Sequence, residues 1–145
     1  MVAQYRKASH TVYSVVVHIV WVTKYRYKVL NHDIGLRTKA LIQRTCSELD
    51  IDIQKGSIAQ DHVHLLLSIP PQLAISNIVQ QLKGITSRKL QQEFPELRKR
   101  YWGQHFWARG YFVVSTGNVT TEMIKNYIEH HFEEPDQGEN FRVET

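Results

Sequence analysis

Two histidines, His62 and His64, stand two residues apart in an apolar stretch of the chain. Side chains at positions i and i+2 of a β-strand point to the same face, so the two imidazoles would lie close enough to share one metal ion. The pair alone is a weak signal, because eight histidines in 145 residues give about 0.4 such pairs by chance. The alternative interpretation is two sheet histidines that are satisfied by hydrogen bonds.

A second pair of residues, Tyr127 and His131, is spaced by four. On a helix this spacing places the phenol and the imidazole one above the other on a single face. A phenol has a pKa of about 10 and attacks phosphodiesters poorly. A divalent metal held by His62, His64 and His131 would draw charge off a bound phosphate and make that attack feasible. A packed core tyrosine and a solvated histidine at a helix C-terminus are the alternatives.

The hydrophobic pattern indicates which elements position these residues. β-Branched and aromatic runs predict strands, and apolar residues at helical spacing predict amphipathic helices. In chain order we expect a strand over 11–23, a helix over 33–49, strands over 51–60 and 62–70, a helix over 74–94, a basic connector over 97–104, a strand over 105–116 and a helix from 119 to about 133. This order predicts an α+β, ferredoxin-like split βαβ fold, which is a four-stranded antiparallel sheet with helices on one face, plus a C-terminal helix that carries the tyrosine.

Length and composition bound the class of protein. A chain of 145 residues and 17.0 kDa, with 42% hydrophobic and 22% charged residues, is expected to form a single domain over 1–145, with a core over about 10–133 and a polar tail over 134–145. The chain shows no apolar run long enough to span a membrane and no signal peptide, so we expect a cytoplasmic protein. The single cysteine, Cys46, excludes an intramolecular disulfide and a thiolate metal cluster.

Basic residues interleaved with aromatic ones predict a nucleic-acid surface. The net charge of +4 and the pI of about 9.2 permit a phosphate-rich partner. The candidate DNA contacts are Lys24, Tyr25, Arg26, Lys83, Arg88, Lys89 and Arg109. The alternative is that these side chains form solvated surfaces at a strand end and on a helix face.

Four motifs, in this order, resemble the HUH single-tyrosine transposases, the TnpA enzymes of IS200-like insertion sequences. They are DHVHLLLSIPP (61–71), VQQLKGITSRKL (79–90), FWARGYFVVSTG (106–117) and IKNYIEHH (124–131). The opening segment HIVWVTKYRYKVL (18–30) also looks like that family. The resemblance covers residues 10 to 133.

The resemblance implies a metal-dependent DNA strand transferase that cuts single-stranded DNA at hairpins of its element and rejoins the ends. By analogy Tyr127 would form a 5′-phosphotyrosine, and His62 and His64 would be the paired metal ligands. Family members act as homodimers and need no nucleotide cofactor. The sequence leaves open whether Tyr127 serves its own subunit or the partner.

One position departs from the family pattern, because His131 stands where the family usually carries Gln. We expect a divalent metal, Mg²⁺ or Mn²⁺, and the imidazole would move the preference toward Mn²⁺, Co²⁺ or Zn²⁺. Asn126, Glu129 and His130 are nearby alternatives as ligands.

Two other functions stay open at this point. The first is a non-catalytic module that binds single-stranded nucleic acid. The segment RGYFVVS, which begins at Arg109, is faintly similar to the RNP1 signature of RNA-recognition sheets. The second is a metal-dependent phosphodiesterase that uses bound hydroxide and forms no covalent intermediate.

Overall fold

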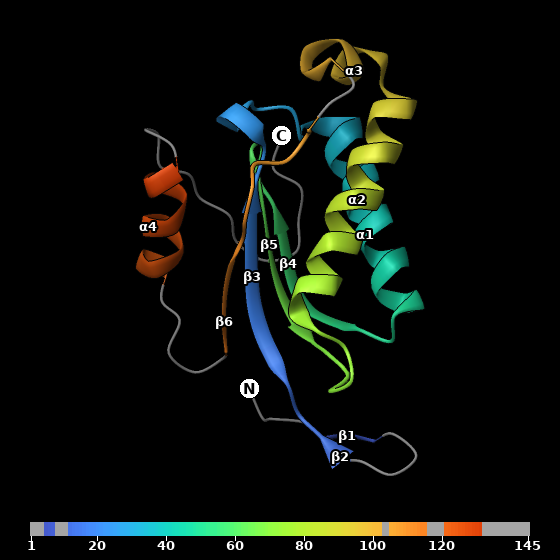
Figure 1. Ribbon diagram of the computed structural model, residues 1–145, viewed down its shortest axis with the longest axis vertical. Helices are drawn as coiled ribbons and strands as arrows, with labels where there is room; N and C mark the ends of the chain where they lie inside the picture. The colour runs from blue at the N-terminus through green and yellow to red at the C-terminus, as the bar shows by residue number, and fades with distance from the viewer. Residues whose placement is uncertain (1–4, 8–11, 103–104, 116–120, 132–145) are drawn as a thin grey trace.

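A four-stranded antiparallel sheet forms the centre of the molecule, with strand order β4-β5-β3-β6 (Figure 1). The computed structural model describes residues 5–7, 12–102, 105–115 and 121–131. The strands of the sheet are β3 (Val16–Val22), β4 (Asp52–Ile58), β5 (His62–Ser68) and β6 (Phe112–Ser115). A short ribbon made of β1 (Arg6–Lys7) and β2 (Val12–Tyr13) precedes them.

The apolar strand β3 lies inside the sheet, paired with β5 on one side and β6 on the other. Its β-branched and aromatic side chains suit a strand that is covered on both faces. Ile19 and Trp21 are fully buried on one face, while Val20 and Val22 are buried on the other. The sheet therefore needs cover on both of its faces.

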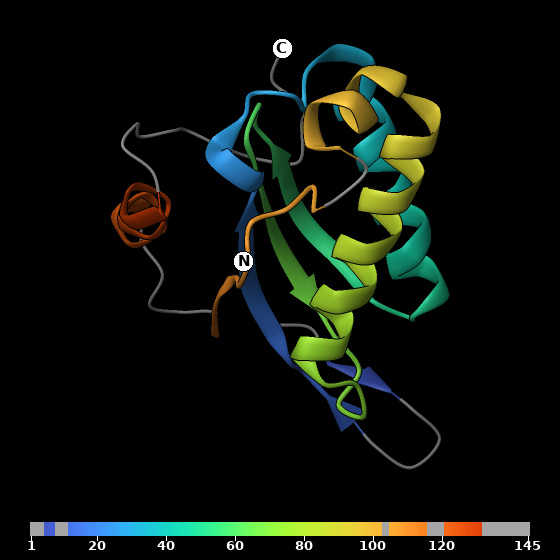
Figure 2. The same ribbon diagram turned by 45° about the horizontal axis from the view of Figure 1, so that its top comes forward.

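Two long helices cover the first face, as both views show (Figures 1 and 2). They are α1 (His32–Glu48) and α2 (Ile75–Glu93), which lie beside each other. Their buried residues, such as Ile42 and Leu82, join the core cluster of Ile19, Trp21 and Leu65. These helices match the predicted ones to within two residues at each end.

Helix α4 (Thr121–His131) covers the second face, on the side of the sheet opposite α1 and α2 (Figures 1 and 2). Ile128 is 1% exposed and clusters with Val20 and Val22 of β3. The predicted α+β architecture, with an added helix that carries the tyrosine, is confirmed. The predicted tail over 134–145 lies outside the described residues.

The segment between α2 and β6 differs from the prediction in two ways. Part of the expected connector is helix α3 (Pro95–Tyr101), because Pro95 suits the first helical turn and Leu97 and Tyr101, four residues apart, are both buried. In the described part of the expected strand over 105–116, Trp107 forms an isolated bridge with Thr23, and the ladder with β3 runs from Phe112 to Ser115.

The described part of the chain contains no helix that is both long and apolar enough to cross a membrane.

Candidate metal and nucleophile site

The predicted histidine pair lies on the face of the sheet that α4 covers. His62 is paired with Val22 across the β3–β5 ladder, and His64 is paired with Val20. Residues directly opposite in an antiparallel pair project from the same face. Val20 and Val22 pack against Ile128 of α4, so the two imidazoles stand beside the patch on which α4 rests.

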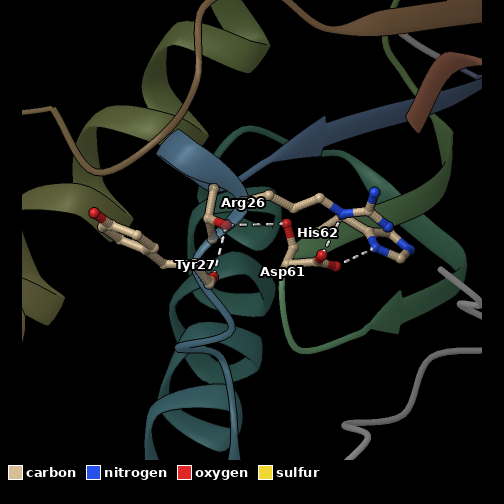
Figure 3. A network of polar contacts seen from close by, with 5 residues as sticks. Arg26, Tyr27, Asp61 and His62 are labelled. Carbon is tan, nitrogen blue, oxygen red and sulfur yellow. Dashed lines mark hydrogen bonds and ion pairs between the residues drawn. The ribbon is translucent and has the colours of Figure 1, made fainter. Parts of the chain in front are cut away.

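His62 is held in one orientation by its sequence neighbour. Its side chain is 1% exposed, and its Nδ1 lies 3.0 Å from Oδ1 of Asp61, whose own side chain is fully buried (Figure 3). A carboxylate accepts and does not donate, so Nδ1 of a neutral His62 carries the proton and Nε2 carries the lone pair. This tautomer is the one that can bind a metal through Nε2.

His64 is half-buried and contacts another histidine. Its Nε2 lies 3.1 Å from Nδ1 of His18, a residue of β3. Burial, and then the neighbouring His18 and His62, lower the pKa of His64 to about 4. Burial, and then the charge of Lys55, also lower the pKa of His18. Both imidazoles are therefore neutral at pH 7, and neutral imidazole is the form that binds metals.

Tyr127 packs over the same face. Its ring contacts Phe112 of β6 with the centroids 5.3 Å apart, and it joins the cluster of Val20, Val22 and Ile128. Its hydroxyl oxygen is buried, and burial raises the pKa of Tyr127 to about 12. The phenol is therefore protonated at neutral pH, and its attack on a phosphodiester needs help from the site.

The third predicted ligand, His131, lies at the end of α4, and its side chain is outside the described residues. Among the side chains that the structure does describe, no three His, Cys, Asp or Glu residues are gathered as a metal-binding group. The structure thus brings His62, His64 and Tyr127 to one face.

Three of the predicted DNA contacts line one groove. Lys24, Lys83 and Arg109 meet in a groove of about 510 Å³ between α2 and the segment that leads into β6. Lys83 is half-buried and donates hydrogen bonds to the carbonyl oxygens of Ala108 (2.8 Å) and Gly110 (3.0 Å). Burial lowers the pKa of Lys83. The groove therefore combines the exposed Arg109 and the half-buried Lys24 with Lys83, which also holds the wall of the groove together.

Lys24 also lines a second hollow, whose walls are aromatic and basic. The turn η1 (Lys24–Arg26) contributes Tyr25, which is 65% exposed, and α3 leads to Trp102, which is 86% exposed. The guanidinium of Arg100 lies 4.6 Å from the ring centre of Tyr27 in the same hollow. Exposed rings beside cations suit the stacking of unpaired bases.

The remaining predicted DNA contacts lie elsewhere. Arg26 is only 8% exposed, and its Nε lies 2.5 Å from Oδ2 of Asp61, so its charge is turned into the protein and not toward a surface phosphate. Arg88 is exposed on α2, outside the lining of the groove. Lys89 lies one turn before Glu93, and its charge helps to lower the pKa of that carboxyl group.

Two residues of the site, Asp61 and His18, were not predicted. Asp61 directly precedes His62, and His18 shares the alternation of Val20 and Val22 along β3. Both signals are present in the sequence. The role of His18, however, follows only from the register of the β3–β5 pair, in which His18 lies opposite Leu66 and Val20 lies opposite His64.

Comparison with known proteins gives a consistent result. The family model described as "Transposase IS200 like" matches residues 11–131. The transposase for insertion sequence element IS200 of Salmonella typhimurium is 31% identical over 138 residues, which cover 95% of this chain and 90% of that protein. The ISDra2 transposase TnpA of Deinococcus radiodurans is 32% identical over 124 residues, which cover 86% of this chain and 89% of that protein.

Solved structures show the same fold. A crystal structure described as that of a Deinococcus radiodurans R1 transposase has a TM-score of 0.81 and 31% identity, and covers 88% of this chain and 98% of its own. A REP-associated tyrosine transposase bound to a REP hairpin has a TM-score of 0.52 and 13% identity, with 89% and 68% coverage. The second likeness concerns the fold alone.

The sheet, the paired histidines and the helix that carries the tyrosine define the class of protein, which is a single-tyrosine transposase of the HUH fold. The chain belongs to the IS200-like transposase family, as the resemblance of its motifs predicted. It is therefore a DNA-binding enzyme of DNA transposition that cleaves and joins DNA.

Proposed function

We propose that this transposase cleaves and rejoins single-stranded DNA at hairpins through a 5′-phosphotyrosine on Tyr127, with a divalent metal bound by His62 and His64. One observation carries the proposal. The helix that bears Tyr127 packs on the sheet face that presents His62 and His64, against the valines paired with them. A nucleophile and a pair of metal ligands therefore share one face, although they lie more than sixty positions apart in the sequence.

The residues of this face fit a metal. The carboxylate of Asp61 accepts from Nδ1 of His62, which leaves Nε2 as the coordinating nitrogen. An ion at Nε2 of His64 would take the place of the contact with His18. A Mg²⁺ or Mn²⁺ ion held by these residues would supply Lewis-acid polarisation of the scissile phosphate. We keep His131 as the proposed third ligand, with Asn126, Glu129 and His130 as alternatives.

The oxygen of Tyr127 attacks the phosphorus as the bond from phosphorus to the 3′-oxygen of the preceding nucleotide breaks. The phenol gives up one proton and the leaving 3′-oxygen takes one up, so it leaves as a free hydroxyl. The bond energy is kept in the phosphotyrosine, so the ends can be rejoined without a nucleotide cofactor. Because burial raises the pKa of Tyr127 to about 12, the phenol must lose its proton as the new bond forms and not before. Packing against Phe112 and beside Ile128 orients the ring for that attack.

The DNA partner that we propose is a single strand with a hairpin. The groove of Lys24, Lys83 and Arg109 supplies cations for the backbone, and the hollow of Tyr25 and Trp102 supplies rings for unpaired bases. The REP-associated tyrosine transposase among the structural neighbours is described as bound to a REP hairpin. The similarity of that protein to this chain is a similarity of fold.

We also propose a homodimer. The supporting feature is β6, which lies at the edge of the sheet with only β3 as its neighbour in the described order β4-β5-β3-β6. An open edge offers backbone groups to a second chain. A single protomer mass in light scattering, at every concentration used, would contradict this.

The central experiment incubates the protein with a single-stranded hairpin DNA and Mn²⁺ and looks for an adduct that survives denaturation. We expect the adduct with the wild type and none with Tyr127→Phe or with chelator. His62→Ala should lose at least 100-fold in rate. Tyr13→Phe is the matched control, because Tyr13 is a buried tyrosine of β2 that lies outside this face and lines neither DNA hollow, so this variant should keep the adduct.

Two outcomes would replace the proposal with another function. Cleavage without an adduct would identify a phosphodiesterase that uses hydroxide. Hairpin affinity that survives both chelator and Tyr127→Phe, with no cleavage at all, would identify a binding module.

A further inference from the structure

A buried chain of three polar side chains leads away from the proposed metal site into the protein (Figure 3). Nε of Arg26 lies 2.5 Å from Oδ2 of Asp61, and Oδ1 of the same carboxylate lies 3.0 Å from Nδ1 of His62. The side chains are 5%, 0% and 1% exposed, respectively. In these two contacts one carboxylate oxygen faces a cation and the other faces an imidazole.

The backbone is shaped to make this chain. Asp61 occupies the bend between β4 and β5, and its carbonyl oxygen accepts a hydrogen bond from the backbone N–H of Thr23 at 2.9 Å. Tyr25 and Arg26 both adopt the left-handed region, at φ 60° and 53°. Residues with a Cβ rarely adopt it. The hydroxyl of Thr23 donates to the carbonyl oxygen of Tyr27 at 2.8 Å and closes the turn. The turn brings Arg26 inward, opposite the bend.

A buried ion pair is weak support for stability, because the desolvation of both charges offsets most of their attraction. A role in stability alone would therefore not explain why Arg26 is buried at the end of an otherwise basic and exposed turn. A role in orientation does explain it. The guanidinium of Arg26 has only hydrogen-bond donors, so it fixes the orientation of the Asp61 carboxylate. That carboxylate has only acceptors, so it fixes which nitrogen of His62 carries the proton.

We propose that Arg26 and Asp61 are positioning residues, which hold His62 as the Nδ1–H tautomer so that Nε2 is presented to the metal. This inference rests on the proposed metal role of His62. It assigns Arg26 a function different from the phosphate contact expected from the sequence.

The first test needs no variant and no metal. Two-bond ¹H–¹⁵N correlation spectra distinguish the protonated from the unprotonated nitrogen of each imidazole. Neutral His62 in the wild type should be protonated at Nδ1, whereas free histidine in water favours Nε2–H. Protonation of His62 at Nε2 would overturn the inference, whatever the protein does with DNA.

The second test reverses the tautomer by one isosteric change. In Asp61→Asn the amide has one acceptor and one donor end, and Arg26 can only donate. We expect the amide oxygen to face Arg26 and the amide N–H to face His62. His62 should then become the Nε2–H tautomer, and its affinity for Mn²⁺, measured by electron paramagnetic resonance, should fall about 10- to 100-fold.

A rescue separates positioning from simple destabilisation. Adding Arg26→Met to Asp61→Asn removes the competing donor, so the amide oxygen can turn back to His62. The double variant should regain the Nδ1–H tautomer and most of the Mn²⁺ affinity, although it has lost one more buried partner. A purely structural role predicts a further loss.

Glu93→Gln is the matched control for charge. It removes the carboxylate of another arginine pair, Arg37–Glu93, which joins α1 and α2 on the other face of the sheet, and it should leave Mn²⁺ affinity unchanged. If Asp61→Asn binds Mn²⁺ within twofold of the wild type, the inference is wrong. If the wild type itself binds no Mn²⁺ or forms no adduct, the proposed metal function fails, while the tautomer result still stands by itself.

Discussion

At the scale of single residues, one buried threonine connects α2 to the wall of the DNA groove. The hydroxyl of Thr86 donates to the carbonyl oxygen of Leu82 at 2.7 Å and accepts from the indole N–H of Trp107 at 2.9 Å. Thr86 is fully buried and Trp107 is 6% exposed. This bond fixes Trp107, which lines the groove beside Arg109.

We predict that Thr86→Val destabilises the protein more than the same change at Thr38. Thr38 is also fully buried in a helix, and its hydroxyl donates to the carbonyl oxygen of Ile34 at 2.7 Å. The indole N–H of Trp107 donates to Thr86 and not to Thr38. Thr86→Val leaves the indole N–H of Trp107 buried without its acceptor, which costs about 1–3 kcal/mol. Urea unfolding of both variants measures the difference, and equal losses would show that the indole bond contributes nothing.

Residue identity and spacing predicted part of the site. The alternation at His62 and His64 and the helical spacing at Tyr127 follow from local geometry, so both could be read from the chain alone. Asp61 and His18 act through neighbours on other strands or turns, and their roles depend on register and on the direction of a bend. The burial of Arg26 against Asp61 could not be read from the sequence for the same reason, because it depends on the left-handed backbone of Tyr25 and Arg26.

At the scale of elements, the two helices on one face are joined by an ion pair with good geometry. Arg37 of α1 donates to both carboxylate oxygens of Glu93 of α2, at 2.8 and 2.9 Å. This hydrogen bonding holds the pKa of Glu93 below its ordinary value of 4.5. Both side chains are 37% exposed, so water screens much of the attraction.

The pH dependence of this pair has a definite sign. Because the folded-state pKa of Glu93 is lower than the unfolded one, the pair stabilises the protein above the unfolded value and loses that contribution as pH falls through the folded value. Glu93→Gln should therefore lower the free energy of unfolding by about 0.5 kcal/mol at neutral pH, and the deficit should shrink on acidification. Urea titrations across pH measure it.

The control is Glu48→Gln, which removes a looser pair within α1. Arg44 and Glu48 are 3.5 Å apart and 75% and 64% exposed. We expect no measurable pH-dependent difference there. A Glu93→Gln deficit that grows toward low pH would show that the sign is wrong.

Elements with strong periodicity were predictable, and irregular ones were not. The apolar residues of α1, α2, β3 and β5 follow a regular spacing over a segment long enough for that spacing to predict the type of element. Helix α3 was missed because its seven residues carry three consecutive basic side chains, Arg98 to Arg100, and only Leu97 and Tyr101 record its buried side. The run into β6 reads as strand, yet Gly110 adopts φ 80° and interrupts it.

At the scale of the whole molecule, the distribution of charge predicts how salt acts on DNA binding. Each phosphate contact releases counterions, so the logarithm of affinity falls with the logarithm of salt concentration by about 0.7–0.9 per contact. Lys24→Gln and Arg109→Gln, both in the groove, should each reduce the slope by roughly that amount. Binding of a hairpin DNA across a salt series, measured by fluorescence anisotropy, tests this.

Arg44→Gln is the control for that series, because Arg44 is an exposed cation on α1, away from the groove. It should leave the slope unchanged. Equal slopes for all variants and the wild type would place the DNA on another surface.

The most consequential feature of the whole fold is that the second face of the sheet is covered by a helix of the same chain. The apolar character of Val20 and Val22 indicates that β3 is buried on both sides, but the pattern alone does not say what covers them. In the structure α4 covers these valines with Ile128 and Tyr127. In this arrangement Tyr127 lies on the same sheet face as His62 and His64 of its own protomer.

Mixing two inactive variants tests this arrangement. In a mixed dimer of Tyr127→Phe and His62→Ala, each protomer lacks one group, so a tyrosine that acts within its own chain leaves both sites dead. A tyrosine that crosses to the other subunit would rebuild one complete site. We expect no adduct on hairpin DNA from the mixture, after subunit exchange has been verified with wild-type protein mixed with a tagged copy. Recovery of up to a quarter of the wild-type activity in an equimolar mixture would show that α4 changes subunits in the working enzyme. The packing of Ile128 on Val20 and Val22 would then belong to a different state of the cycle.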